Sequence, residues 1–177
     1  MKLSCTSVML PRWDLDQTFD KLAEYGYEGL ELRCRNVKDD APEEPSFWGR
    51  HLADISPDNI VDRAGEIQAA SKRSGIQVVA LAPQAIVGED ELIDKLFAGA
   101  IAIDPDEPPM IRIGAPRHDR TKPYHPQFDE ARAGFAALAE KARKRGVKAL
   151  YEIHVGTVAV SCSRTIELLK DLDTDHM

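Results

Sequence analysis

Residues 146–157 read Gly-Val-Lys-Ala-Leu-Tyr-Glu-Ile-His-Val-Gly-Thr, and this stretch indicates both the fold and the chemistry. A glycine typical of a helix end precedes a short apolar strand, and Glu152 and His154 follow near the carboxyl end of that strand. Because side chains alternate between the two faces of a strand, both project to the same side. A carboxylate and an imidazole placed in this way can hold a divalent metal or transfer a proton.

The same strand-and-helix unit repeats upstream and downstream. Asp14 with Gln17 three residues on resembles a capping box, and Ser56-Pro57 is typical of a helix start. We expect strands at residues 3–8, 29–34, 77–82 and 110–113, and a fifth strand that carries Glu152. Apolar stripes predict five helices, marked by Leu15, Phe19 and Leu22; by Ile60, Ala64 and Ile67; by Leu92, Ile93, Leu96 and Phe97; by Phe128, Ala131, Phe135, Leu138 and Ala142; and by Ile166, Leu169 and Leu172.

Strict alternation of strands and helices predicts an α/β fold with a parallel sheet and right-handed crossovers. The helix-to-strand connections are short and centred on glycine, whereas the strand-to-helix connections are long, above all residues 35–56 and 115–127. Long loops after the strands place the functional surface at the carboxyl ends of the strands. Since the first strand is not followed by a Gly-rich phosphate-binding turn, we expect a (β/α)8 TIM barrel rather than a nucleotide-binding sheet.

Four segments together resemble the xylose isomerase-like sugar phosphate isomerase/epimerase superfamily, which includes inosose dehydratases and ketose 3-epimerases. They are Leu3-Ser-Cys-Thr-Ser-Val, Ala23-Glu-Tyr-Gly-Tyr-Glu-Gly-Leu-Glu-Leu-Arg, Met110-Ile-Arg-Ile-Gly-Ala-Pro and Tyr151-Glu-Ile-His-Val-Gly-Thr. The resemblance implies a TIM barrel with a divalent metal (Mn, Mg, Co or Zn) held by four side chains. It makes Glu152 the first metal ligand and a catalytic residue, with the other ligands supplied by strands six to eight.

The repeating pattern stops at Met177, before a sixth strand. A complete barrel typically needs about 250 residues. We therefore expect residues 1–177 to form a single truncated barrel domain of five β/α units, in which the first and fifth strands have unpaired outer edges. We expect this form to bind the metal weakly and to be inactive. The alternative is a natural short protein that closes by pairing with a second chain, as a homo-oligomer.

Further candidates for substrate binding lie on the strands and loops. Besides His154, they are Glu31 and Arg33 on the second strand, Arg112 on the fourth, and Trp13 in the first loop, whose indole can stack on a sugar ring. Each also has a purely structural interpretation: Glu31 and Arg33 can form an internal ion pair, and an indole can simply pack under a loop. The charged residues at 117–120 indicate either a solvated loop or phosphate recognition.

Composition limits the partners. The chain has 177 residues, 43% hydrophobic and 30% charged, and a net charge of −7. A negative chain is not attracted to nucleic acid or acidic membranes, so a small sugar or polyol is the expected substrate. The sequence shows neither an apolar run long enough for a membrane span nor a signal-peptide pattern, so the cytoplasm is the expected location. The functional hypothesis is a metal-assisted isomerase or epimerase acting on a ketose or inosose. Two alternatives stay open: an endonuclease IV-like DNA-repair enzyme, and a non-catalytic carbohydrate-binding or assembly half-barrel.

Overall fold

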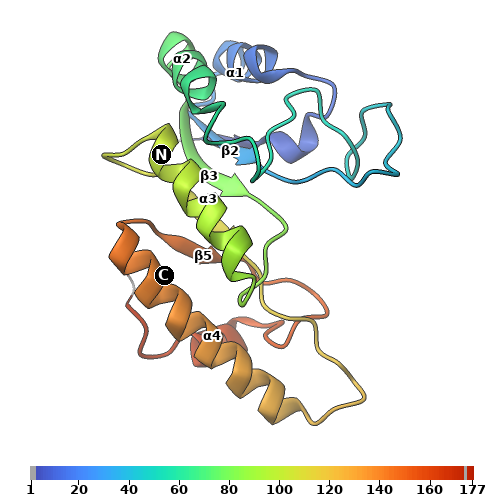
Figure 1. Ribbon diagram of the computed structural model, residues 1–177, viewed down its shortest axis with the longest axis vertical. Helices are drawn as coiled ribbons and strands as arrows, with labels where there is room; N and C mark the ends of the chain where they lie inside the picture. The colour runs from blue at the N-terminus through green and yellow to red at the C-terminus, as the bar shows by residue number, and fades with distance from the viewer. Residues whose placement is uncertain (1–2, 174) are drawn as a thin grey trace.

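Five parallel strands, paired in the order β1-β2-β3-β4-β5, form one sheet in the computed structural model, which describes residues 3–173 and 175–177. The strands are β1 Ser4–Thr6, β2 Gly29–Arg33, β3 Gln77–Ala82, β4 Met110–Ile113 and β5 Ala149–Tyr151. The helices are the 3-10 helix η1 Ser7–Met9, α1 Leu15–Glu24, α2 Ala64–Ser74, α3 Asp90–Ile103, α4 Tyr124–Arg145 and α5 Cys162–Leu168. The predicted α/β architecture of five β/α units is confirmed (Figure 1).

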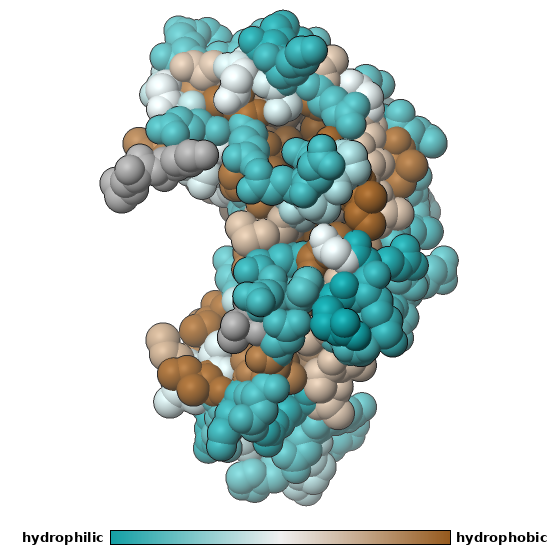
Figure 2. All heavy atoms as spheres, turned by 90° about the vertical axis from the view of Figure 1, so that its left-hand side faces the viewer, coloured by the Kyte–Doolittle hydropathy of each residue, from teal (hydrophilic) through white to brown (hydrophobic). Residues whose placement is uncertain are grey.

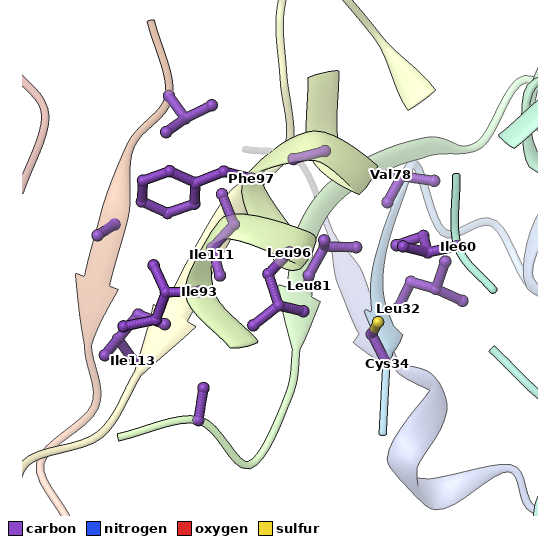
Figure 3. Packing of buried hydrophobic residues seen from close by; sticks show 14 of the residues in the cluster. Leu32, Cys34, Ile60, Val78, Leu81, Ile93, Leu96, Phe97, Ile111 and Ile113 are labelled. Carbon is purple, nitrogen blue, oxygen red and sulfur yellow. The ribbon is translucent and has the colours of Figure 1, made fainter. Parts of the chain in front are cut away.

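The core lies between the sheet and its helices. Ile111 and Ile113 of β4 are fully buried, and they pack with Ile93, Leu96 and Phe97 of α3 in one cluster (Figure 3). The alternate strand residues, Arg112 among them, are only half-buried because they point to the opposite face. Figure 2 shows the whole molecule as a crescent with one hollowed side. One face of the sheet is thus covered by helices, as in a barrel, and the other carries polar side chains.

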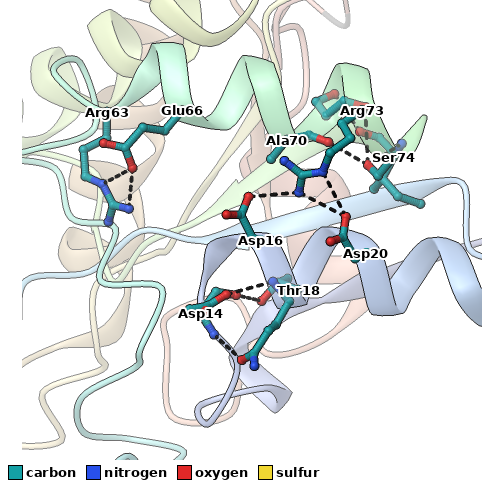
Figure 4. Close-up of polar contacts among 12 residues, drawn as sticks. Asp14, Asp16, Thr18, Asp20, Arg63, Glu66, Ala70, Arg73 and Ser74 are labelled. Carbon is teal, nitrogen blue, oxygen red and sulfur yellow. Dashed lines mark hydrogen bonds and ion pairs between the residues drawn. The ribbon is translucent and has the colours of Figure 1, made fainter.

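The contact between α1 and α2 is held by polar groups at its surface. Asp14 and Gln17 form the predicted capping box at the start of α1: the Asp14 carboxylate accepts from the Gln17 N–H at 2.8 Å, and the Gln17 side chain accepts from the Asp14 N–H at 3.1 Å. Arg73 of α2 contacts both Asp16 and Asp20 of α1, at 2.9 and 3.0 Å (Figure 4). These exposed pairs join the two helices at the surface and each contributes little to stability.

Several predicted boundaries are wrong. The fifth strand ends at Tyr151, so Glu152 follows it and does not lie on it. The first strand ends at Thr6, because its hydroxyl accepts from the Val8 N–H at 3.4 Å and caps η1. The second helix starts at Ala64 and not at Ser56, because the Asn59 side chain accepts from the Ser56 N–H at 2.8 Å and the chain first makes a series of turns. The fifth helix ends at Leu168, so Leu169 and Leu172 lie beyond it, although both still pack against the core.

The fifth strand is not fully unpaired at its outer edge, contrary to expectation. The Ala149 N–H donates to the carbonyl of His176 at 3.0 Å, so the last residues of the chain lie against this edge. Met177 also packs against the core cluster. None of the helices in the described part of the chain combines the length and apolar character needed to cross a lipid bilayer.

Candidate functional site

A hollow of about 600 Å³ lies at the carboxyl ends of the strands. Its walls come from the segments at or after the ends of all five strands: Thr6, Val8 and Met9; Arg35, Phe47 and Trp48; Pro83, Gln84, Ala85 and Ile86; Arg112, Gly114, Ala115 and Arg117; Glu152, His154, Val155 and Thr157. This is the end of a parallel α/β sheet or barrel at which ligands bind. The loops predicted to carry function therefore do meet at one place.

Arg112 lies between two carboxylates. Its Nη1 atom is 3.2 Å from Oε2 of Glu152 and 3.4 Å from Oε1 of Glu31. The β4–β5 register pairs Arg112 with Leu150, and Glu152 follows directly after β5, where its carboxylate contacts Arg112. The side chains of Arg112 and Glu31 are 20% and 24% exposed, whereas that of Glu152 is 53% exposed. Glu152 is therefore the carboxylate of this cluster that a ligand in the hollow reaches most easily.

Arg35, which follows β2, is a site residue that the sequence interpretation missed. It is only 7% exposed, its Nε donates to the Ala82 carbonyl at 3.2 Å, and its Nη1 is buried without a hydrogen-bond partner among the described residues. Burial and then the nearby Arg112 charge lower the pKa of Arg35, while Glu31 and Glu152 act in the opposite direction. The only available signal was its position directly beyond a strand end.

Trp48 lies at the mouth of the hollow with its side chain largely exposed. The Arg35 guanidinium is 5.9 Å from the centre of the Trp48 ring, and Phe47 packs edge-on against the indole at 4.4 Å between ring centres. The loop is anchored by His51, which is 5% exposed and whose Nε2 is 3.4 Å from the Phe47 carbonyl oxygen. Burial, followed by the charge of Arg33, lowers the pKa of His51 to about 4. A neutral, buried imidazole thus supports the loop that carries Phe47 and Trp48.

The remaining predicted residues occupy different positions. His154 lines the hollow beside Glu152, with its Nδ1 3.1 Å from the Val155 carbonyl oxygen. Arg33 is 5% exposed, and its Nη2 donates to the Gly49 carbonyl at 2.8 Å. Burial, followed by the Arg35 charge, lowers the pKa of Arg33 to about 10. Trp13 packs near Tyr25, with 6.4 Å between ring centres. Neither Arg33 nor Trp13 is among the residues that line the hollow.

The donor groups on this face do not complete a divalent-metal site. Among the residues that the structure describes, no group of three or more His, Cys, Asp or Glu side chains is placed to hold a metal ion. Glu152 and His154 offer two donors, and the carboxylate of Glu152 already contacts the Arg112 cation. A hard divalent ion requires about six oxygen-rich ligands, so these residues alone do not fit it.

Comparison with known proteins adds the fold relatives. No protein-family model matches the sequence, and no match is found among the curated proteins. Solved structures do match. The probable 3-DHS dehydratase AsbF, involved in petrobactin synthesis in Bacillus anthracis, superposes with a TM-score of 0.69 and 16% identity over 99% of this chain and 61% of AsbF. The 3-keto-D-glucoside 4-epimerase YcjR of E. coli gives 0.63 and 14% over 98% and 65%. The IolI protein, solved with a zinc atom, gives 0.64 and 16% over 99% and 60%.

Other matched structures include a xylose isomerase domain-containing protein and a xylose isomerase-like TIM-barrel fusion protein, and this chain shares their fold. The chain spans about three fifths of the length of AsbF and of IolI, and its five β/α units correspond to part of a barrel. At these identities the likeness establishes the fold, and the chemistry has to be argued from the side chains of the site.

Proposed function

We propose that this chain is a sugar isomerase/epimerase-like protein, and that the hollow at the carboxyl ends of its strands binds a ketose or an inosose. The observation that carries this proposal is the Glu31–Arg112–Glu152 cluster on the inner face of the sheet. Two proteins of the same fold support the substrate class by their names, one a dehydratase and one a keto-glucoside epimerase. A small polar ligand also suits a hollow of about 600 Å³.

The lining of the hollow has the chemistry that a polyol requires. Charged carboxylate and guanidinium groups make directional hydrogen bonds to neighbouring hydroxyl groups, and Glu152 and Arg112 present both kinds side by side. The Trp48 ring offers an apolar face for the C–H side of a sugar ring. His154 adds an exposed imidazole next to Glu152.

Isomerisation, epimerisation and dehydration of such substrates all begin with removal of a proton from a carbon beside a carbonyl group. We assign Glu152 as the group that accepts this proton, because it is the most accessible carboxylate of the cluster. A divalent metal would assist by polarising the carbonyl, but the described residues do not complete its site. We therefore propose turnover only for a barrel that supplies the missing ligands, and substrate binding for the residues described here.

A second candidate function is carbohydrate binding without catalysis. It is favoured by one specific contact: the carboxylate that would serve as base and metal ligand is held by Arg112. The two candidates share the same ligand and the same hollow. Only the first candidate function predicts that a ketose is converted when a divalent metal is present.

Binding can be measured by the fluorescence of Trp48, in a Trp13→Phe background that removes the other indole. We expect D-tagatose and scyllo-inosose to change the emission in a saturable way, and Glu152→Gln to weaken binding by about tenfold, as expected for the loss of a charged hydrogen-bonding partner. The matched control is Glu130→Gln, an exposed residue of α4, which should bind like the parent. Saturation by neither sugar, or equal affinities of the two variants, would contradict the proposal.

A further inference from the structure

A second hollow of about 650 Å³ adjoins the first, between the loop that follows β4 and the segment that runs from β5 into α5. Three arginines, Arg117, Arg120 and Arg164, line it together with His118, and no Asp or Glu is among its lining residues. This is unexpected in a chain whose net charge is −7. The acidic residues that make the chain negative overall do not line this hollow.

Two of these cations have no acidic partner. Within the part of the chain that the structure describes, no ion pair is formed by Arg117 or Arg120, although exposed arginines elsewhere in the chain repeatedly pair with carboxylates. Asp119 lies between them in sequence but is occupied elsewhere: its carboxylate accepts from the Thr121 hydroxyl at 2.6 Å and contacts Lys122 at 3.4 Å. Within the described residues, the charges of Arg117 and Arg120 are therefore not neutralised by an ion pair.

The backbone that carries the cations is held in place. Arg117 pairs with Thr157 in an antiparallel bridge, the His118 N–H donates to the Gly156 carbonyl at 2.9 Å, and the Val158 N–H donates to the Pro116 carbonyl at 3.1 Å. These bonds join the loop after β4 to the loop after β5. The two walls of the hollow are thus positioned relative to each other before any ligand arrives.

Arg164 is oriented by aromatic contacts. Its guanidinium carbon is 5.4 Å from the centre of the Tyr124 ring and 5.9 Å from that of Phe128, and the Tyr124 hydroxyl donates to the Val158 carbonyl at 2.7 Å. Glu167 pairs with it at 2.6 Å, one turn further along α5. A guanidinium stacked on rings retains free N–H groups in its plane, which is the geometry that binds phosphate oxygens.

We propose that this second hollow binds a phosphate monoester, through Arg117, Arg120 and Arg164. Arg117, Val155 and Thr157 line both hollows, so one ligand can place its polyol beside Glu152 and its phosphate among the arginines. The substrate class is then a phosphorylated ketose or polyol. The phosphate site stands on the arginine cluster alone, while its connection to a sugar rests on the proposed function above.

The phosphate site is tested first with inorganic phosphate, by calorimetry at low ionic strength. We expect saturable binding that weakens as salt is added, and a loss of about tenfold or more in affinity for Arg117→Gln and for Arg120→Gln, as for other charge-assisted hydrogen bonds. Both side chains are exposed, so neither substitution should disturb folding, which circular dichroism verifies. The matched control is Arg145→Gln, at the opposite end of α4, which should stay within about twofold of the parent. An absence of phosphate binding, or an equal loss in the control, would overturn the site.

The link to a sugar is tested with D-tagatose 6-phosphate. We expect it to bind more tightly than either inorganic phosphate or D-tagatose, because the two hollows are then filled by one molecule. Glu152→Gln should weaken the sugar phosphate but leave inorganic phosphate unaffected, which separates a failure of the proposed function from a failure of the phosphate site. If the ester binds no more tightly than inorganic phosphate, the second hollow serves a free anion and the connection to a sugar is wrong.

Discussion

The guanidinium of Arg112 lies 3.2 Å from the carboxylate of Glu152, and this contact joins β4 to the segment that follows β5. The same group reaches Glu31 on β2 at 3.4 Å, past the intervening strand β3. One cation thus connects three strand ends on the inner face of the sheet. The stability of this face and its ligand binding therefore depend on the same side chains.

Arg112→Gln should destabilise the protein by about 1–2 kcal/mol, because the largely buried Glu31 carboxylate and the more exposed Glu152 carboxylate lose their shared cation. Urea unfolding followed by circular dichroism measures this. Arg145→Gln, the removal of an exposed cation, should change the free energy of unfolding by less than about 0.5 kcal/mol. Equal effects of the two substitutions would show that the cluster has no structural role.

Arg35→Met should leave the free energy of unfolding unchanged or raise it, because it replaces a buried cation that has an unpartnered Nη1 by an apolar side chain of similar length. The same substitution should weaken sugar binding, measured by Trp48 fluorescence, since Arg35 lines the hollow and contacts that ring. Arg50→Met, in the same loop but exposed, is the control for binding. A large loss of stability in Arg35→Met would mean that the charge is structurally required.

His51 should make stability depend on pH. Its pKa is lowered from 6.5 to about 4 in the folded protein, so the unfolded chain takes up the proton first as pH falls. The contribution is fully present above about pH 6.5 and is lost progressively toward pH 4, with a limiting slope of about 1.4 kcal/mol per pH unit. Thermal unfolding between pH 7.5 and about pH 4.5 should show a fall in Tm that His51→Gln reduces and His125→Gln, at an exposed position, retains. Identical curves for both variants would exclude His51 as the source.

Two helical glycines should respond in opposite directions to alanine. At Gly99 of α3 the added methyl group would overlap the fully buried Ile60, so Gly99→Ala should destabilise by about 1–3 kcal/mol. At Gly65 of α2 nothing lies within 4 Å, so Gly65→Ala should stabilise by about 0.5–1 kcal/mol through helix propensity. Denaturant unfolding of both variants checks the pair. A stabilised Gly99→Ala would show that α3 and the Ile60 segment are less tightly packed than described.

Mn²⁺ should bind this chain weakly, because Glu152 and His154 supply too few ligands and Arg112 repels a second cation near Glu152. Arg112→Gln should therefore increase the affinity, whereas Glu152→Gln should abolish the remaining binding. Calorimetry measures the Mn²⁺ affinity of both variants and of the parent chain. One Mn²⁺ per parent chain at micromolar affinity would contradict this view and would point to ligands from a second copy.

Much of the fold is readable from local sequence. Gly75 and Gly146 adopt positive φ at helix ends, where glycine is unstrained, and each precedes a predicted strand. The capping box at Asp14 and the apolar stripes located helices because these signals act within one or two turns of the chain. The alternation of residues along β4 also separates Arg112 from the buried Ile111 and Ile113, since the period of two is a property of the strand itself.

The partners of these residues were decided by tertiary structure alone. An internal ion pair with Arg33 was one of the two interpretations of Glu31, yet Glu31 pairs with Arg112, while Arg33 donates to Gly49 in the loop before α2. Strand alternation assigns a face, but contact across a sheet depends on register and on irregularities such as the shift at Leu30/Glu31. For the same reason, the burial of Arg35, its contact with the Trp48 ring and the meeting of Arg117, Arg120 and Arg164 depend on how the long loops fold over the strand ends. Local patterns determine which face a side chain takes, and packing between distant segments determines what it meets there.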